Sequence, residues 1–85
     1  MLGPRLIAHL SKRYAPDTRL DQSFGRQEMT FITNADGDPM KLFIGDRNPD
    51  GAIRGEWYVR TLLREAESGR IIKDHWDRKG NTHGR

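Results

Sequence analysis

The sequence predicts an α+β fold: one N-terminal helix packed on a roughly four-stranded antiparallel sheet of two hairpins. An amphipathic segment follows an early proline, and two pairs of strand-forming segments are each joined by a glycine-containing turn. Eighty-five residues are enough for only one domain. We expect residues 1–80 to form this globular domain and residues 81–85 to form a flexible polar tail.

The helix is predicted over residues 4–14. Pro4 suits the first helical position, and Gly3 is an acceptable N-cap. Apolar side chains recur on one side at helical spacing, namely Leu6, Ile7, Leu10 and Tyr14. Pro16 ends the helix, because a proline disfavours the α conformation in the residue before it. We expect the polar residues 15–27 to form a loop or ordered linker.

The first hairpin is predicted over residues 28–45. Strand formers cluster at residues 29–33 and again at 40–44, and Asp36-Gly37 lies in the turn between them. Both clusters are apolar on both faces near their centres, which indicates central strands covered on one side by the helix.

Residues 53–66 are ambiguous between strand and helix. Val59, Leu62, Leu63 and Ala66 match helical spacing, whereas Ile53, Trp57, Tyr58, Val59 and Thr61 favour a strand. A hairpin that pairs residues 55–65 with 70–77 is the preferred interpretation, because Ser68-Gly69 supplies a turn. The predicted core comprises Leu6, Leu10, Phe31, Leu42, Ile44, Trp57, Val59, Leu63, Ile72 and Trp76.

Composition excludes several classes of protein. The chain has no cysteine, which rules out a disulfide framework, a zinc ribbon and a thiol nucleophile. Its formal net charge of +3 is modest, and basic and acidic residues are mixed along the chain. A dedicated nucleic-acid binder has a stronger basic excess. We expect a cytoplasmic protein that does not associate with membranes, because neither a signal peptide nor a membrane-spanning run is recognisable.

The second hairpin carries cations beside an aromatic ring. Strand alternation would place Tyr58, Arg60 and Arg64 on one face, and the return strand could set Lys73 and His75 beside them. Rings that stack on bases and cations that contact phosphates are typical of domains that hold single-stranded nucleic acid. These five residues are therefore the predicted nucleic-acid site. The alternative is the solvated face of an edge hairpin, where charges discourage aggregation.

Two further motifs suggest metal binding or catalysis. Asp46-x-Asn48-x-Asp50-Gly51-x-Ile53 resembles the first half of an EF-hand calcium loop, but Trp57 stands where the bidentate glutamate is required. We therefore interpret this segment as a turn. His75, Asp77 and His83 could supply metal ligands or an acid–base pair, although His83 lies in the predicted tail.

The sequence favours a small non-catalytic module that binds an anionic partner, with RNA or single-stranded DNA first. One alternative is a protein-interaction or homodimerisation module that uses the same face or an open strand edge. A second is a small metal-independent ribonuclease that uses His75. We expect no cofactor and no bound metal.

Overall fold

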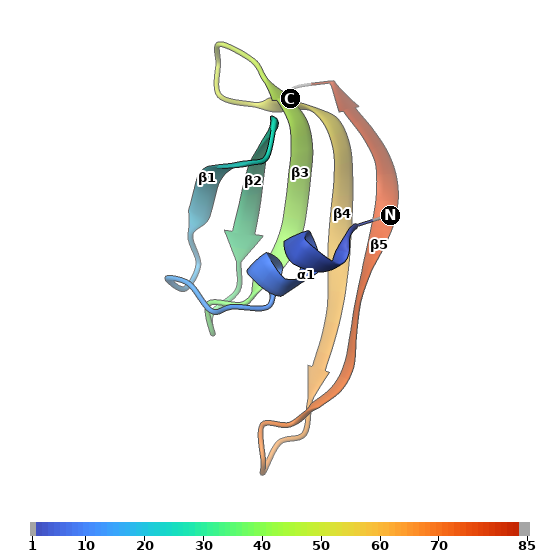
Figure 1. Cartoon of the computed structure of the whole chain (residues 1–85). Helices are drawn as coiled ribbons and strands as arrows, with labels where there is room; N and C mark the ends of the chain where they lie inside the picture. The colour runs from blue at the N-terminus through green and yellow to red at the C-terminus, as the bar shows by residue number, and fades with distance from the viewer. Residues whose placement is uncertain (1, 84–85) are drawn as a thin grey trace.

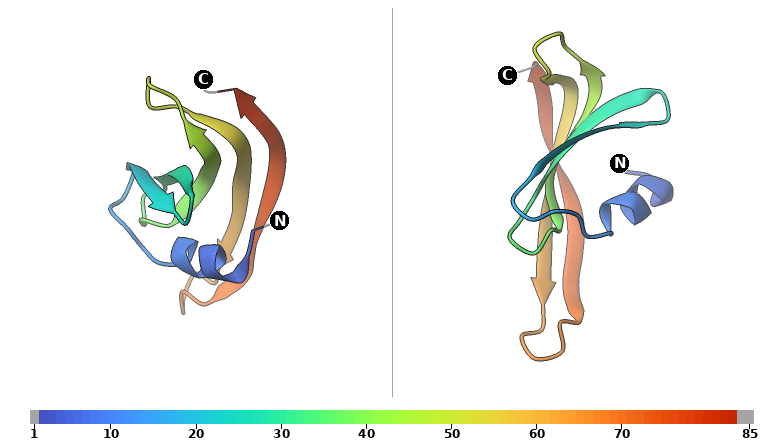
Figure 2. Two further views of the ribbon diagram at one scale, coloured as in Figure 1. Left: turned by 45° about the horizontal axis from the view of Figure 1, so that its top comes forward. Right: turned by 90° about the vertical axis from the view of Figure 1, so that its left-hand side faces the viewer.

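The computed structural model describes residues 2–83 and confirms the α+β fold. The helix α1 (Pro4–Leu10) precedes five strands, which are β1 (Arg19–Phe24), β2 (Gln27–Thr33), β3 (Pro39–Arg47), β4 (Ile53–Arg64) and β5 (Ile71–His83). The strands form one antiparallel sheet in chain order, from β1 at one edge to β5 at the other. α1 lies against one face of this curved sheet (Figures 1 and 2).

β1 is a strand that the sequence pattern does not predict. The polar composition of residues 15–27 indicates a loop, but residues 19–24 pair with β2 in regular register. Half-buried and exposed residues alternate along β1, with Leu20 and Phe24 packed against the core. The polar Gln22 shares the side of Leu20 and Phe24, and its amide oxygen bonds His9 Nε2 at 2.7 Å. Because Gln22 is polar, the sequence of β1 does not show the apolar alternation typical of a strand. The sheet therefore has five strands, where the sequence predicts about four.

α1 ends at Leu10 rather than at residue 14. The Ser11 N–H bonds Ala8 O at 3.2 Å. Tyr14 then donates its N–H to Gly37 O in the turn between β2 and β3, at 2.8 Å. The backbone of Tyr14 is therefore bonded to the sheet, and tertiary contacts override its local helical spacing.

The core lies between α1 and the sheet. Its buried members are Leu6, Leu10, Met29, Phe31, Leu42, Ile44 and Tyr58. The predictions for Leu6, Leu10, Phe31, Leu42 and Ile44 are confirmed, and Trp76 packs partly buried against the cluster. Leu63 and Ile72 are 52% and 58% exposed, so their assignment to the core is wrong. Trp57 and Val59 are half-buried and lie on the other face.

The preferred hairpin interpretation of the C-terminal half is confirmed. β4 and β5 pair antiparallel over almost their whole length, with register shifts near Trp57 and near Leu63. Their turn extends past the ends of the other strands (Figure 1). Residues 81–83 continue β5, whereas the predicted tail begins at residue 81. The last part of that tail, residues 84–85, lies outside the described residues.

Candidate interaction surfaces

The predicted nucleic-acid residues do not form one exposed face. Tyr58 and Arg60 are only 3% and 4% exposed and lie on the helix-covered side of β4. Their Cα partners on β5 are Arg78 and Trp76. Tyr58 and Arg60, which the sequence predicts on an exposed face, are therefore buried.

Lys73 and His75 lie on the opposite side of the sheet from Tyr58 and Arg60. Lys73 pairs with Leu63, and His75 pairs with Thr61, so both project with the odd-numbered residues of β4. Leu42 and Ile44 face α1 in the core and pair with Tyr58 and Glu56, which fixes the helix-facing side of β4. The prediction that Trp57 and Val59 face the core is therefore wrong, because the pairing of β4 with β3 decides which side chains face α1.

Arg60 joins three segments of the fold. Its guanidinium donates two bonds to the Asp74 carboxylate, at 2.7 and 2.8 Å, and also bonds Leu10 O and Pro39 O, each at 3.1 Å. It also lies over the Trp76 ring, with the guanidinium carbon 5.7 Å from the ring centroid. Arg60 thus connects the end of α1, the start of β3 and β5, which is a structural use of a residue predicted to bind phosphate.

Arg64 also has a structural partner. Its guanidinium donates to Asp38 Oδ1 at 3.3 Å, and Arg13 donates to the same oxygen at 3.2 Å. The Asp38 side chain is only 2% exposed. This cluster ties the start of the β4–β5 turn to the segment after α1, and the two arginines compensate a buried carboxylate.

The bond to Arg60 lowers the pKa of the Asp74 carboxyl, against the opposing effect of burial. A folded-state pKa below the unfolded value gives stability above the unfolded pKa of about 3.9, and that stability is lost as pH falls through the folded value.

We expect Asp74→Asn to be less stable than the wild type near neutral pH and the difference to shrink in acid. Urea unfolding from about pH 2 to pH 7 measures this. Asp36→Asn, at an exposed turn residue, is the control; a deficit for Asp74→Asn that does not change with pH would contradict the assignment.

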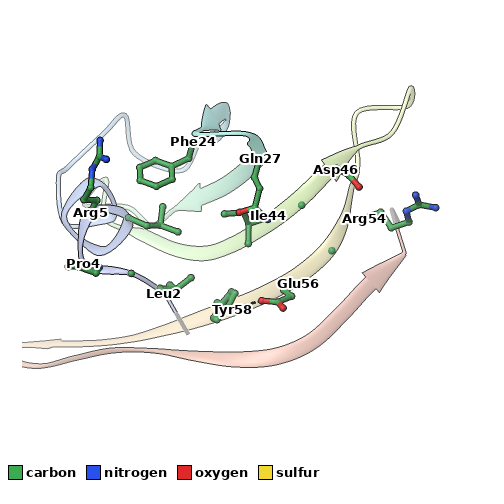
Figure 3. A pocket seen from close by; sticks show the side chains of 14 residues that line it. Leu2, Pro4, Arg5, Phe24, Gln27, Ile44, Asp46, Arg54, Glu56 and Tyr58 are labelled. Carbon is green, nitrogen blue, oxygen red and sulfur yellow. Dashed lines mark hydrogen bonds between the residues drawn. The ribbon is translucent and has the colours of Figure 1, made fainter.

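A cleft of about 620 Å³ opens between α1 and the sheet beside Tyr58 (Figure 3). The Tyr58 hydroxyl donates to Glu56 Oε1 at 2.6 Å. Burial raises the pKa of Tyr58, and the bond from Tyr58 lowers the pKa of Glu56. Both shifts therefore move the pKa values of this pair away from neutral pH.

The predicted histidine pair is not brought together. His75 and His83 lie on the same extended strand, and at about 3.3 Å per residue their backbones are more than about 20 Å apart. His75 Nε2 instead contacts Asp77 Oδ2 at 3.1 Å, and both side chains are about half exposed, at 45% and 51%. The strand geometry therefore places the backbones of His75 and His83 too far apart for the two residues to belong to one site.

The calcium-like segment forms the connection between β3 and β4. Asp46 belongs to β3, while the Asp50 carboxylate accepts the Ala52 N–H at 3.0 Å. Arg19 and Arg47 both donate to Gly51 O, each at 2.8 Å. Within residues 2–83, no group of three or more acidic or histidine side chains has a metal-binding arrangement. The turn interpretation of this segment is confirmed.

The end of the β4–β5 hairpin exposes apolar side chains. Of the four large apolar residues exposed within residues 2–83, three lie there: Leu63, Ile71 and Ile72, at 52%, 45% and 58%. The fourth, Ile32, lies on the uncovered face of the sheet and is 37% exposed. Solvent-facing apolar groups gathered at one place commonly mark a binding surface.

β5 is an open sheet edge, because its only strand partner in the described chain is β4. The Glu65 N–H donates to Arg70 O across the turn, so the odd residues of β4 bond toward β5. Their partners Lys73, His75 and Asp77 therefore bond inward. The backbone groups that face outward along this stretch belong to Asp74, Trp76 and Arg78.

The sheet face opposite α1 carries a pair of stacked rings. Phe43 and Trp57 lie 5.9 Å apart between centroids and 9° from parallel. Lys41 and Val59 are the adjacent pair along the same strands. A hollow of about 180 Å³ lies beside Phe43 and is lined by Arg19, Thr30, Ile32, Phe43, Ala52, Ile53 and Thr82.

Comparison of the chain with family models, with curated proteins and with solved structures gave no match. Among the described residues, no helix has both the length and the apolar character needed to cross a membrane.

Proposed function

We propose that the chain is a non-catalytic protein-interaction module that binds another polypeptide strand along the open edge of β5. The observation that carries this proposal is the coincidence of two features on one hairpin. The outward backbone groups of β5 run directly into the exposed end formed by Leu63, Ile71 and Ile72. Main-chain bonds at such an edge provide affinity, and adjacent side chains provide specificity.

A partner strand would stabilise the end of the β4–β5 hairpin more than it would stabilise the rest of the sheet. Thr61–Arg64 lie beyond the paired part of β3, so this stretch has only β5 as a strand neighbour. An isolated two-stranded hairpin is marginal in water, and a third strand would bury apolar surface that now faces solvent.

The edge is also limited in length, which favours a defined partner over indiscriminate aggregation. Ile72 and Lys79 have no Cα partner on β4 and lie at the two register shifts. Between them, Lys73–Arg78 pair regularly. Bulges and charges on an edge strand restrict non-specific pairing, so this stretch is the accessible site.

Selection from a random peptide display library tests this proposal, because it requires no assumption about the sequence of the partner. We expect selected peptides to alternate apolar and polar residues, and to bind Arg78→Pro at least about tenfold more weakly than the wild type, because proline removes an outward N–H. Arg78→Ala is the matched control, since it removes the same side chain but keeps the amide. Selected peptides that bind Arg78→Pro as tightly as Arg78→Ala would overturn the proposal.

Binding of RNA or single-stranded DNA is the second candidate, favoured by the stacked Phe43 and Trp57 on the uncovered face. Lys41 lies beside them in the sheet and could contact phosphate. Two other cations of this face are paired with carboxylates, since Arg47 bonds Glu28 at 3.2 Å and Arg19 bonds Asp21 at 3.1 Å. Fewer cations therefore remain for phosphates than the sequence suggests.

Titration with a fluorescent oligothymidylate at low salt tests this second candidate. We expect Trp57→Leu to weaken binding by about tenfold or more, because stacking on one base contributes about 1–3 kcal/mol. Tyr58→Phe is the control. Because Tyr58 is buried, this substitution should leave the affinity for the oligonucleotide unchanged. No measurable binding even at low salt would exclude nucleic acid as the ligand.

A further inference from the structure

We infer that the strand that binds β5 is β5 of a second copy of this chain, paired antiparallel about a two-fold axis at Trp76. This inference rests on the proposed function and names its partner. The resulting dimer would carry one continuous sheet across the two chains.

Backbone alternation limits the registers that can form. The outward groups of one β5 must meet the outward groups of the other, because only those groups are free to bond. A two-fold axis pairs each residue with its counterpart in reverse order. An axis at Trp76 satisfies both conditions, since it sets Trp76 opposite Trp76, and Asp74 opposite Arg78.

Charge selects this register among the neighbouring ones. An axis at Trp76 places Arg78 opposite Asp74, whose carboxylate also accepts two bonds from Arg60, and His75 opposite Asp77, and symmetry repeats each pair. An axis at residue 74, 77 or 78 would set two identical charges directly opposite each other. An axis at His75 would place two histidines together and leave only Lys73 opposite Asp77. Opposite charges directly across a strand pair stabilise it, and like charges destabilise it.

The local structure fits the same register. Lys79, which would follow opposite Lys73, is the extra residue at a register shift of β5, so those two lysines would not meet in regular register. The exposed end of one hairpin would run beside residues 80–82 of the second copy. Gly80 has no atom within 4 Å of the place a side chain would occupy, so there is space for an apolar residue from the other chain.

Engineered cysteines test the register cleanly, because the chain has none of its own. In the inferred dimer, residue 75 of one chain and residue 77 of the other form a pair that is not hydrogen-bonded across the interface. Such pairs have Cα atoms about 4.5 Å apart, which suits a disulfide. We expect oxidation of an equimolar mixture of His75→Cys and Asp77→Cys, after subunit exchange, to give the mixed disulfide dimer.

Each cysteine variant alone is the matched control. The Cα atoms of the same residue in the two copies would be diagonal neighbours about 8 Å apart, beyond the reach of a disulfide, so little cross-linking is expected. Efficient cross-linking of His75→Cys alone or of Asp77→Cys alone would overturn the axis at Trp76. Sedimentation of the wild type should show twice the mass of one chain, and a monomer at all concentrations up to the millimolar range would overturn the dimer. A monomer whose β5 still binds selected peptides would leave the proposed function intact, which separates the two failures.

Discussion

Replacement of Arg60 by alanine is expected to destabilise the fold by about 3–5 kcal/mol, a large part of the roughly 5–15 kcal/mol typical of a domain. The Arg60 side chain is only 1% exposed and bonds Asp74 and two backbone carbonyls. Its loss would leave a carboxylate and the carbonyls of Leu10 and Pro39 without their donor. Buried groups that lose a partner incur most of their desolvation cost. Urea unfolding followed by far-UV circular dichroism measures the change.

Two variants control this measurement. Arg54→Ala removes an exposed arginine from the same strand and should change stability by less than about 0.5 kcal/mol. Arg60→Lys keeps the positive charge but loses the planar fork, so an intermediate loss is expected. If Arg60→Ala unfolds at the same urea concentration as Arg54→Ala, Arg60 does not hold α1, β3 and β5 together.

Replacement of Gly37 by alanine is expected to cost at least about 3 kcal/mol, through backbone strain and a steric clash together. Gly37 has a φ of 85°, and a Cβ atom there would lie 2.1 Å from Tyr14 O. The neighbouring atoms belong to the backbone of the segment after α1, so a rotamer change cannot relieve the clash. The same contact includes the bond from Tyr14 N–H to Gly37 O.

Gly25→Ala separates the two causes. Gly25 also has a positive φ, of 63°, but nothing lies within 4 Å of the added atom. It should therefore lose only the strain, about 1–2 kcal/mol. Equal melting temperatures for the two variants would show that the segment after α1 does not pack on the β2–β3 turn.

The elements that local patterns encode strongly were predictable. Pro4 and the apolar spacing after it located α1, and Asp36-Gly37 located the first hairpin turn. The ambiguous residues 53–66 form a strand, as β-branched and aromatic residues favoured. The end of α1 could not be predicted, because it depends on the bond between Tyr14 and Gly37, two residues far apart in sequence.

The side of the sheet to which each residue of β4 points could not be predicted from β4 alone. Trp57 and Tyr58 are adjacent aromatic residues, and either could have faced the core. The choice follows from β3, where Leu42 faces α1 and pairs with Tyr58, while Phe43 stacks on Trp57. A one-residue change of register moves every side chain of a strand to the opposite face of the sheet. For this reason Tyr58 and Arg60 face the core and do not form the predicted basic face.

The burial of Arg60 also had no local signal. An arginine between Val59 and Thr61 is typical of a solvated strand position. The partner that compensates its charge, Asp74, comes from β5, and the carbonyls that it bonds come from α1 and β3. The sequence did, however, indicate an open strand edge as a route to another chain, and the exposed end of β4–β5 gives that alternative a location.

Amide hydrogen exchange along β5, followed by NMR, tests the central claim most directly. At a concentration where the chain is associated, we expect slow exchange at Asp74, Trp76 and Arg78, whose amides face outward. On dilution to the monomer these three should exchange rapidly, while Lys73, His75 and Asp77 stay protected by β4. Rapid exchange at the three outward amides in the associated state would contradict the claim, because association would then use a surface other than the edge of β5.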